Sequence, residues 1–459
     1  MAEDIRILSP CGMLGYGFPE NSFLIGLKEK IHGIVVDAGS TDAGPHKLGA
    51  GVSIVSKRAA KKDLQILIRN GLPRKIPIII GSAGGAGASI HVDWTLEIIE
   101  EILQEDKLDA KVAVIRADIP KHHIVKALKE EKIISLSPNI PALTEQTILE
   151  TEQIVAQMGH EPIVEALNCE SDIIVCGRAY DPSPFAAIGL YYGKEPGLSY
   201  HLGKILECGA LCAEPGTTKD CILGTIKENS FTVKSLNPKR KCTSVSVAAH
   251  TFYEKEHPYL LKGPGFVLHL KDCEFVERDA GVIEVFHSKY FPAEKRMIKL
   301  EGARKKAYRT FVLAGVRDPL LLEKLDEVEE QVKQQTADYY SEISPEDYGI
   351  HFYNYGMNGV LGSKETELFK GHEAAVLFEV VAKTQELANS ICATVRSTFL
   401  HYGYENRKST AGNLAFPFAP SDIEFGAVYE FSIYHLMEDQ EGLFKAEYAR
   451  RGVSYGLTN

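Results

Sequence analysis

The sequence lacks several features that mark membrane, secreted or metal-binding proteins. No apolar run approaches the ~18 residues that a membrane-spanning helix needs. The first residues, Met1 to Ile5, lack the basic start and the apolar stretch of a signal peptide. The nine cysteines include no CxxC pair, and their odd number is typical of free thiols in a reducing cytosol. These absences predict a soluble, cytoplasmic protein.

The sequence also has fewer basic than acidic residues. The chain has 62 acidic and 51 basic residues and a net charge of −11. An acidic surface disfavours nucleic-acid binding. The composition, 44% hydrophobic and 25% charged, is that of a globular protein, and 459 residues favour two or three domains. Large α/β enzymes are often homo-oligomers, so we expect one here.

The first half of the chain alternates between two patterns. Short Ile/Val runs at residues 5–8, 33–37, 76–80, 111–115 and 172–175 predict buried strands. Helical spacing of apolar residues predicts helices at 92–103, 121–131 and 145–158. The alternation predicts an α/β fold with a doubly wound, mostly parallel sheet over residues 1–220. Ligands of such sheets bind outside the carboxyl ends of the strands.

The second half changes in pattern. Residues 232–236, 245–248, 266–270 and 282–286 are expected to form strands, and 303–314 and 319–335 helices. Further strands are expected at 351–355, 374–381 and 428–435, with a helix at 385–401. We therefore expect an α+β segment at 221–340 that completes the core and a smaller α+β domain at 341–459.

A glycine-rich loop runs from Gly81 to Trp94, between a strand and a helix. Its spacing is GxxGGxG, which is neither GxGxxG nor a Walker A loop. Backbone N–H groups at a helix start favour a carboxylate or phosphate. The alternative is a tight turn packed with small residues. The candidate substrate-binding residues of this loop are Gly81, Ser82, Gly84, Gly85 and Gly87.

A second loop begins with Asp37, at the end of a strand. Ser40, Thr41 and Asp42 follow it closely, so hydroxyl and carboxylate groups gather near one point. They could hold a divalent cation or orient a hydroxyl-bearing substrate, with Asp37 as an acid–base group. The alternative is an Asx turn with a helix cap.

A third loop contains Arg178 and Asp181. Arg178 could clamp a substrate carboxylate through two hydrogen bonds, and Asp181 precedes Pro182, so it could also cap a helix. A buried pair between Arg178 and an aspartate is the structural alternative. In the C-terminal part, Asn413 lies in a small polar turn beside aromatic residues and is a further candidate for substrate binding.

The segment 250–257 offers the clearest acid–base set. On a helix, His250, Glu254 and His257 would lie at i, i+4 and i+7 on one face. Two imidazoles and a carboxylate could bind a metal or transfer protons, although the spacing is not HExxH. A polar helix face is the alternative.

Several stretches resemble the acyclic terpene utilisation (AtuA-like) family, in order and over nearly the whole chain. They lie at 37–45, 81–94, 176–184, 246–259, 300–304, 402–420 and 429–437, and 246–259 contains the core Ala-Ala-His-Thr-Phe-Tyr-Glu. The resemblance implies catabolism of branched acyl chains and acidic carboxylates, beside a small partner protein that is not fused here. It carries over no catalytic residue.

Three functions remain open. The first is a lyase, a hydratase or dehydratase of a branched hydroxy-acid or its CoA thioester, because dehydration needs a base for the α-proton and an acid or metal for the hydroxyl. The second is a hydrolase or isomerase in the same cleft. The third is a non-catalytic subunit that binds an acyl ligand for a partner.

Overall fold

The computed structural model describes residues 3–39, 44–367, 371–408, 411–439 and 442–453. The chain divides into two compact units. Unit 1 contains residues 1–304 and 431–459, and unit 2 contains residues 305–430. The boundaries therefore fall within two long strands, β17 (Met297–Val316) and β20 (Asp422–Glu438). They differ from the expected boundaries near residues 220 and 340.

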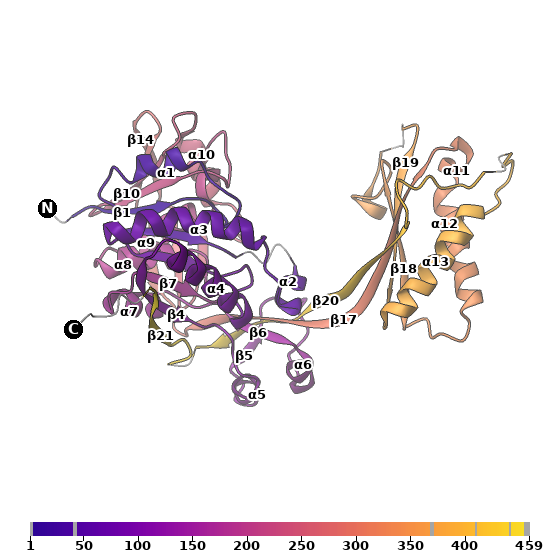
Figure 1. Ribbon diagram of the computed structural model, residues 1–459, viewed down its shortest axis with the longest axis horizontal. Helices are drawn as coiled ribbons and strands as arrows, with labels where there is room; N and C mark the ends of the chain where they lie inside the picture. The colour runs from indigo at the N-terminus through magenta and orange to yellow at the C-terminus, as the bar shows by residue number, and fades with distance from the viewer. Residues whose placement is uncertain (1–2, 40–43, 368–370, 409–410, 440–441, 454–459) are drawn as a thin grey trace. The chain divides into compact units, whose positions relative to one another are not determined.

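Unit 1 is built on a ten-stranded sheet in the order β14-β15-β10-β9-β1-β2-β3-β7-β4-β21 (Figure 1). The central strands are β1 (Ile5–Ser9), β2 (Gly33–Asp37), β3 (Ile78–Gly81), β7 (Ile173–Cys176) and β4 (Asp109–Ile115). These five run parallel. The flanking strands β9 (Ile222–Ile226), β10 (Ser230–Ser235), β15 (Val282–Phe286), β14 (Glu274–Asp279) and β21 (Ala446–Gly452) are antiparallel to their neighbours. The fold is mixed α/β, and the sheet is mixed rather than mostly parallel.

Both faces of the central sheet are covered by helices, which explains why its strands are continuous apolar runs. Alternate residues of β2 point to opposite sides. Val35 packs in one core with α8 and α9, and Ile34 and Val36 pack in the other with α3 and α4. The helices of unit 1 are α1 (Glu20–Gly26), α2 (Pro45–Ala50), α3 (Lys57–Gly71), α4 (Ser89–Glu105), α5 (Lys121–Lys129), α6 (Glu145–Glu150), α7 (Glu161–Asn168), α8 (Ser183–Tyr191), α9 (Pro196–Leu206) and α10 (Ser244–Thr251).

Smaller strands complete unit 1. Strand β6 (Gln153–Ala156) pairs with the first part of β17, and β5 (Ile133–Ser135) pairs with the last part of β20. The others are β8 (Ala213–Glu214) with β11 (Lys241–Cys242), and β12 (Leu260–Gly263), β13 (Phe266–His269) and β16 (Lys289–Pro292).

Unit 2 packs helices against antiparallel strands. The strands are β18 (Tyr348–Tyr355), β19 (Ala374–Ala382) and the parts of β17 and β20 that belong to this unit. The helices are α11 (Pro319–Glu323), α12 (Leu325–Tyr339) and α13 (Gln385–His401). Its core contains Val328 and Val332 of α12, Phe378 of β19 and Phe399 of α13.

The structure corrects three expected elements. Residues 303–314 form part of strand β17 rather than a helix, and 245–248 lie in helix α10 rather than a strand. The single helix expected at 145–158 is α6 followed by strand β6. By contrast, β2, β15 and α13 have the expected bounds. Among the described helices, none has the length and apolar character needed to cross a bilayer.

Candidate functional site

Three of the predicted loops meet at one edge of the central sheet. Asp37 ends β2 and pairs in register with Gly81, which ends β3. Arg178 follows β7, the next strand in the sheet. The carboxyl ends of parallel strands share one edge, and ligands of α/β sheets bind there. The structure therefore brings the Asp37, Gly81–Ser82 and Arg178–Asp181 segments together, as the sequence predicts.

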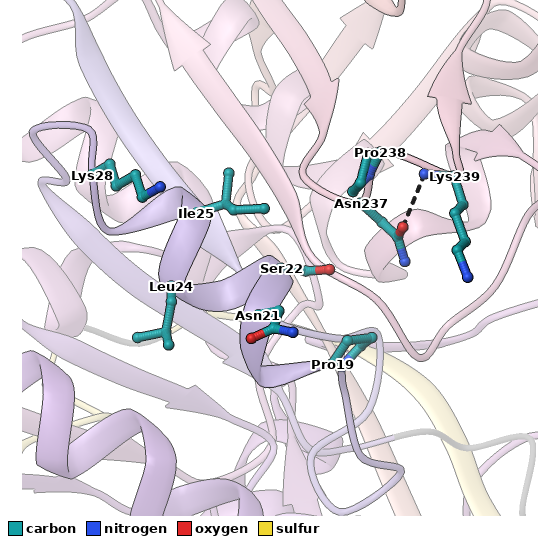
Figure 2. A pocket seen from close by; sticks show the side chains of 9 residues that line it. All are labelled: Pro19, Asn21, Ser22, Leu24, Ile25, Lys28, Asn237, Pro238 and Lys239. Carbon is teal, nitrogen blue, oxygen red and sulfur yellow. Dashed lines mark hydrogen bonds between the residues drawn. The ribbon is translucent and has the colours of Figure 1, made fainter.

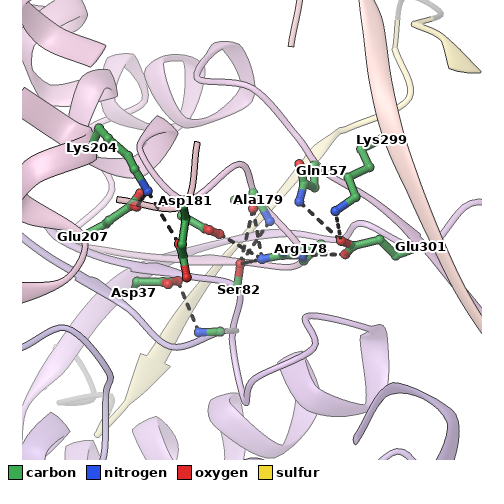
Figure 3. A network of polar contacts seen from close by, with 12 residues as sticks. Asp37, Ser82, Gln157, Arg178, Ala179, Asp181, Lys204, Glu207, Lys299 and Glu301 are labelled. Atoms are coloured by element: carbon green, nitrogen blue, oxygen red, sulfur yellow. Dashed lines mark hydrogen bonds and ion pairs between the residues drawn. The ribbon is translucent and has the colours of Figure 1, made fainter. Parts of the chain in front are cut away.

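Arg178 is the centre of a buried hydrogen-bond network (Figure 3). Its Nε donates to Glu301 Oε2 at 2.7 Å. Its Nη1 donates to Asp181 Oδ1 at 2.9 Å and to Ser82 Oγ at 3.1 Å. The residue is only 3% exposed. Two of its nitrogens therefore bind internal carboxylates, which supports the structural alternative over a free substrate clamp.

Glu301 is a site residue that sequence reasoning missed. It lies on β17 and is buried, and Lys299 Nζ lies 2.9 Å from its second oxygen. Burial alone would raise the pKa of Glu301, but Arg178 and Lys299 outweigh it and hold the pKa below its ordinary value. Glu301 is therefore ionised at neutral pH and fixes Arg178 in place.

Asp37 has the opposite electrostatic character. It is buried, and its Oδ1 accepts a hydrogen bond from Gly39 N at 3.2 Å. Burial and the nearby Asp181 carboxylate raise the pKa of Asp37 well above its ordinary value, although Arg178 opposes this. Asp37 therefore keeps its proton to a higher pH than an ordinary aspartate does.

Lys204 and Glu207 form a second buried, hydrogen-bonded pair nearby. Lys204 belongs to α9 and Glu207 follows the helix, and Nζ lies 2.5 Å from Glu207 Oε1. Burial raises the pKa of Glu207 to about 8, against the opposing charge of Lys204 and with a further contribution from Asp181. Sequence reasoning missed both residues. Their signal is a lysine and a glutamate at i and i+3, at the end of a helix that is buried along most of its length.

Four polar atoms in this region are shielded from solvent and have no hydrogen-bond partner among the described residues. They are Tyr180 Oη, Glu207 Oε2, His250 Nε2 and Lys255 Nζ. Burial, Lys204 and Lys255 lower the pKa of His250 to about 4. Burial and Lys204 lower the pKa of Lys255 to about 8. Unpaired buried polar groups are rare, and groups with shifted pKa values gather at functional sites.

These groups and the network around Arg178 make up what we call the buried polar cluster. Its members are Asp37, Arg178, Tyr180, Asp181, Lys204, Glu207, His250, Lys255 and Glu301. Electrostatic coupling links its two halves, because Asp181 raises the pKa of both Asp37 and Glu207. The cluster combines carboxyl groups of raised pKa, a neutral imidazole and an amine close to its titration point.

The helical face expected for His250, Glu254 and His257 does not exist. Helix α10 ends at Thr251, and the φ angle of Glu254 is +57°, a left-handed conformation that cannot continue a helix. His250 is buried in the cluster, and Glu254 Oε2 lies 3.7 Å from Lys204 Nζ. His257 is exposed, and its Nδ1 accepts hydrogen bonds from the backbone N–H groups of Tyr259 and Leu260.

The glycine-rich loop packs directly against the chain around Arg178. Gly87 O accepts a hydrogen bond from Arg178 N at 3.0 Å. A Cβ at Gly87 would lie 2.2 Å from Arg178 N, so no larger residue fits. Gly81, Gly84 and Gly85 are similarly crowded, by Pro184, His91 and Ile54. These contacts support the tight-turn interpretation, and anion binding by the loop stays a prediction.

The remaining candidates lie elsewhere. Ser40, Thr41 and Asp42 fall outside the described residues. Asn413 belongs to unit 2, where its side-chain amide donates to the carbonyl oxygens of Phe399 and Tyr402 at 2.8 and 2.9 Å. These carbonyls lie at the end of α13, so Asn413 caps that helix instead of joining the cluster.

A surface pocket of about 650 Å³ is lined by a different set of residues, which Figure 2 shows. It is mostly apolar, with Lys28 and Lys239 among its lining residues. The other lining residues are Pro19, Asn21, Ser22, Leu24, Ile25, Asn237 and Pro238. No member of the buried polar cluster lines it, so it is not part of the candidate site.

Metal binding was one interpretation of the histidine and aspartate motifs. Within the part of the chain that the structure describes, no three His, Cys, Asp or Glu side chains gather so that they could hold a metal ion.

Comparison with known proteins identifies the family. The model of the acyclic terpene utilisation family protein AtuA matches residues 57–413. The chain belongs to this family. The match begins after Asp37 and includes all other members of the cluster. Neither the comparison with curated proteins nor that with solved structures gave a match.

Proposed function

We propose that this member of the acyclic terpene utilisation family is a hydro-lyase that adds or removes water on a branched hydroxy-acid or its CoA thioester. The observation that carries the proposal is the set of four shielded polar atoms that lack partners in the described part of the chain, on Tyr180, Glu207, His250 and Lys255. The family's description, acyclic terpene utilisation, supports a substrate from carboxylic-acid catabolism.

Dehydration needs a base for the α-proton and an acid for the departing hydroxyl. His250 is the proposed base, since a pKa of about 4 keeps its imidazole neutral and no described residue is a hydrogen-bond partner of Nε2. Glu207 is the proposed acid, since its pKa of about 8 keeps the carboxyl group protonated near neutral pH. Asp37, whose pKa is also raised, is a second acid of the same site.

A hydrolase or isomerase would use the same groups. Cys208, the neighbour of Glu207 in the chain, is a poor nucleophile because burial and Glu207 raise the pKa of its thiol. A thioester hydrolase that attacks through this thiolate is therefore disfavoured. A non-catalytic, acyl-binding subunit would bind the same ligands without transforming them.

The first experiment is a thermal-shift panel on metal-stripped protein with divalent metals, hydroxy di- and tricarboxylic acids and branched acyl-CoA thioesters. A ligand at about 100 times its Kd stabilises the protein by about 2.7 kcal/mol. Ligands that bind are then incubated in water labelled with heavy oxygen. A hydro-lyase places the label in a hydroxyl group, a thioester hydrolase in a carboxylate and an isomerase in neither.

The matched variants are Glu207→Gln and Glu228→Gln. Glu228 is exposed, in the turn between β9 and β10. We expect Glu207→Gln to lower the rate of label incorporation by about 100-fold or more, as for loss of a general acid, while Glu228→Gln changes nothing. Equal rates in both variants, or label in the carboxylate only, would overturn the proposal.

A further inference from the structure

Lys255 differs from an ordinary structural lysine in the surroundings of its amine. It follows α10, and its Nζ is shielded from solvent and has no hydrogen-bond or carboxylate partner among the described residues. The ring of Phe252 is 5.7 Å from Nζ. A buried ammonium is normally paired, so an unpaired one is costly unless the amine loses its proton.

A second cation lies in the same cluster. Lys204 Nζ is 5.7 Å from the ring centre of Tyr253, which stacks on His250 at 5.6 Å. Lys204 is held by Glu207, with Glu254 as a second, more distant carboxylate. Lys204 therefore keeps its charge, and this charge together with burial favours the neutral amine of Lys255.

The other titratable groups that act on the pKa of Lys255 have smaller effects than burial and Lys204. Cys273 and Glu207 act in the opposite direction on its pKa, and their effect is smaller than that of burial and Lys204. The pKa values of His201 and His250 are themselves lowered by Lys255, and burial is the main cause in each. The net result is a pKa of about 8. A substantial fraction of the amine is then uncharged and nucleophilic at neutral to mildly alkaline pH.

We propose that Lys255 is a covalent catalytic residue that forms a Schiff base with a ketone or aldehyde group of an oxo-substituted hydroxy-acid. The proposal rests on the proposed dehydration and names its substrate class. A desolvated lysine beside a second cation is an established way to activate an amine for this chemistry. An oxo-acid is favoured over a thioester because only a ketone or aldehyde gives an iminium with a lysine.

Atoms and protons balance in each step with groups of the buried polar cluster and water alone. The lone pair of Lys255 Nζ attacks the carbonyl carbon, and a proton moves from nitrogen to oxygen to give a carbinolamine. The carboxyl group of Glu207 protonates the hydroxyl, which leaves as water and forms the iminium. The iminium then accepts the electron pair released when His250 removes the α-proton, giving an enamine. The enamine expels the β-hydroxyl as a second water, with a proton from Asp37, and hydrolysis by water releases Lys255.

The test is trapping with sodium borohydride, which reduces an iminium to a stable amine. Purified full-length protein is incubated separately with 2-oxobutanoate, acetoacetate and 4-oxopentanoate, reduced, digested and analysed by mass spectrometry. We expect the mass of the reduced adduct on the peptide that contains Lys255, with at least one of the three acids, and more adduct at pH 8 than at pH 6.

Two arginine variants serve as a matched pair. Lys255→Arg keeps the positive charge but removes the nucleophilic amine, and should lower adduct formation by about 100-fold or more. Lys262→Arg changes an exposed lysine of β12 and should have no effect. Circular dichroism of both variants checks that they fold. If Lys255→Arg is unfolded, the wild-type peptide map still decides, because the adduct is located directly.

The possible outcomes distinguish the Schiff-base proposal from the hydro-lyase proposal. An adduct confined to Lys255 without incorporation of heavy oxygen into a hydroxyl supports the Schiff base and removes the hydro-lyase. Heavy-oxygen incorporation that continues unchanged in Lys255→Arg overturns the Schiff base and leaves the hydro-lyase. No adduct with any of the three acids, or equal adduct on Lys255 and Lys262, also overturns it.

Discussion

Arg178 and Glu301 lie 123 residues apart in the sequence, yet Arg178 Nε donates to Glu301 Oε2 at 2.7 Å and both side chains are almost completely buried. One follows the central strand β7 and the other lies on β17. The pair therefore joins the carboxyl edge of the parallel strands in the main sheet to a strand that lies outside that sheet. Breaking the pair should therefore lower the stability of the protein.

We predict that Arg178→Ala destabilises the protein by about 3–5 kcal/mol, because it leaves the buried Glu301 carboxylate with only Lys299 as a charged partner. The control is Arg450→Ala, which breaks an exposed pair with Asp109 and should cost about 1 kcal/mol or less. Urea unfolding of unit 1 measures both. Equal costs would mean that the buried pair carries no special stability.

Unit 2 should depend on pH through Glu329 of α12. Its side chain is 5% exposed, and burial raises its pKa from 4.5 to about 7, against an opposing contact with Asn354. The folded state thus favours the protonated form. The resulting contribution to the free energy of unfolding is complete below pH 4.5 and is lost as the pH rises towards 7. The free energy of unfolding changes by about 3 kcal/mol over this range.

The measurement is urea unfolding of the full chain between pH 5 and pH 8, followed by hydrogen exchange in unit 2. Glu329→Gln should flatten the pH dependence, because an amide does not ionise. Glu330→Gln is the neighbouring control, since Glu330 is 68% exposed and pairs with Lys333. A pH dependence that survives in Glu329→Gln would assign it to another group.

The glycine-rich loop permits a steric prediction. Gly87 and Gly193 both have a positive φ, of 68° and 71°, so alanine is strained at either position by about 1–2 kcal/mol. Only at Gly87 would the new Cβ also meet a backbone atom, at 2.2 Å, whereas nothing lies within 4 Å of it at Gly193. Gly87→Ala should therefore lower the melting temperature clearly more than Gly193→Ala. Equal shifts would show that the loop can move away from Arg178.

The pH dependence of activity should be a narrow bell. The rate rises with pH as Lys255 loses its proton through about 8, and falls as Glu207 loses its proton through about 8. We expect kcat/KM to peak near pH 8 on whichever substrate the ligand panel identifies. Glu207→Gln should remove the alkaline decline as well as lower the rate. A profile that is flat from pH 7 to pH 9 would exclude one or both groups from the reaction.

Sequence patterns located the edge of the sheet where the cluster lies, because glycine and aspartate loops followed the Ile/Val runs there. Asp37, Arg178 and Asp181 were recognised for this reason. Glu301, the third side-chain partner of Arg178, was not, since it is brought to Arg178 by a long-range strand pairing that has no local signature. Lys204 and Glu207 were missed because apolar residues surround them and the helix carrying them is buried on every side.

The secondary-structure predictions that were wrong also have physical causes. In 303–314, the charged and apolar residues of β17 fit helical spacing as well as alternation, and pairing with β19 decides for a strand. At 250–257, spacing alone placed three side chains on one helix face, but the chain leaves the helix at Thr251. Periodicity does not report where a helix ends when no proline or glycine lies at its last turn.

The position of β21 fixes an order of events during synthesis. This strand closes one edge of the main sheet by pairing with β4 along residues 446–452, and its residues follow the whole of unit 2 in the sequence. On the ribosome, the buried apolar strand β4 must therefore wait with an open edge while more than three hundred further residues are made. An uncovered strand edge promotes association with other chains, so this protein should depend on chaperones during translation more than its ordinary composition suggests.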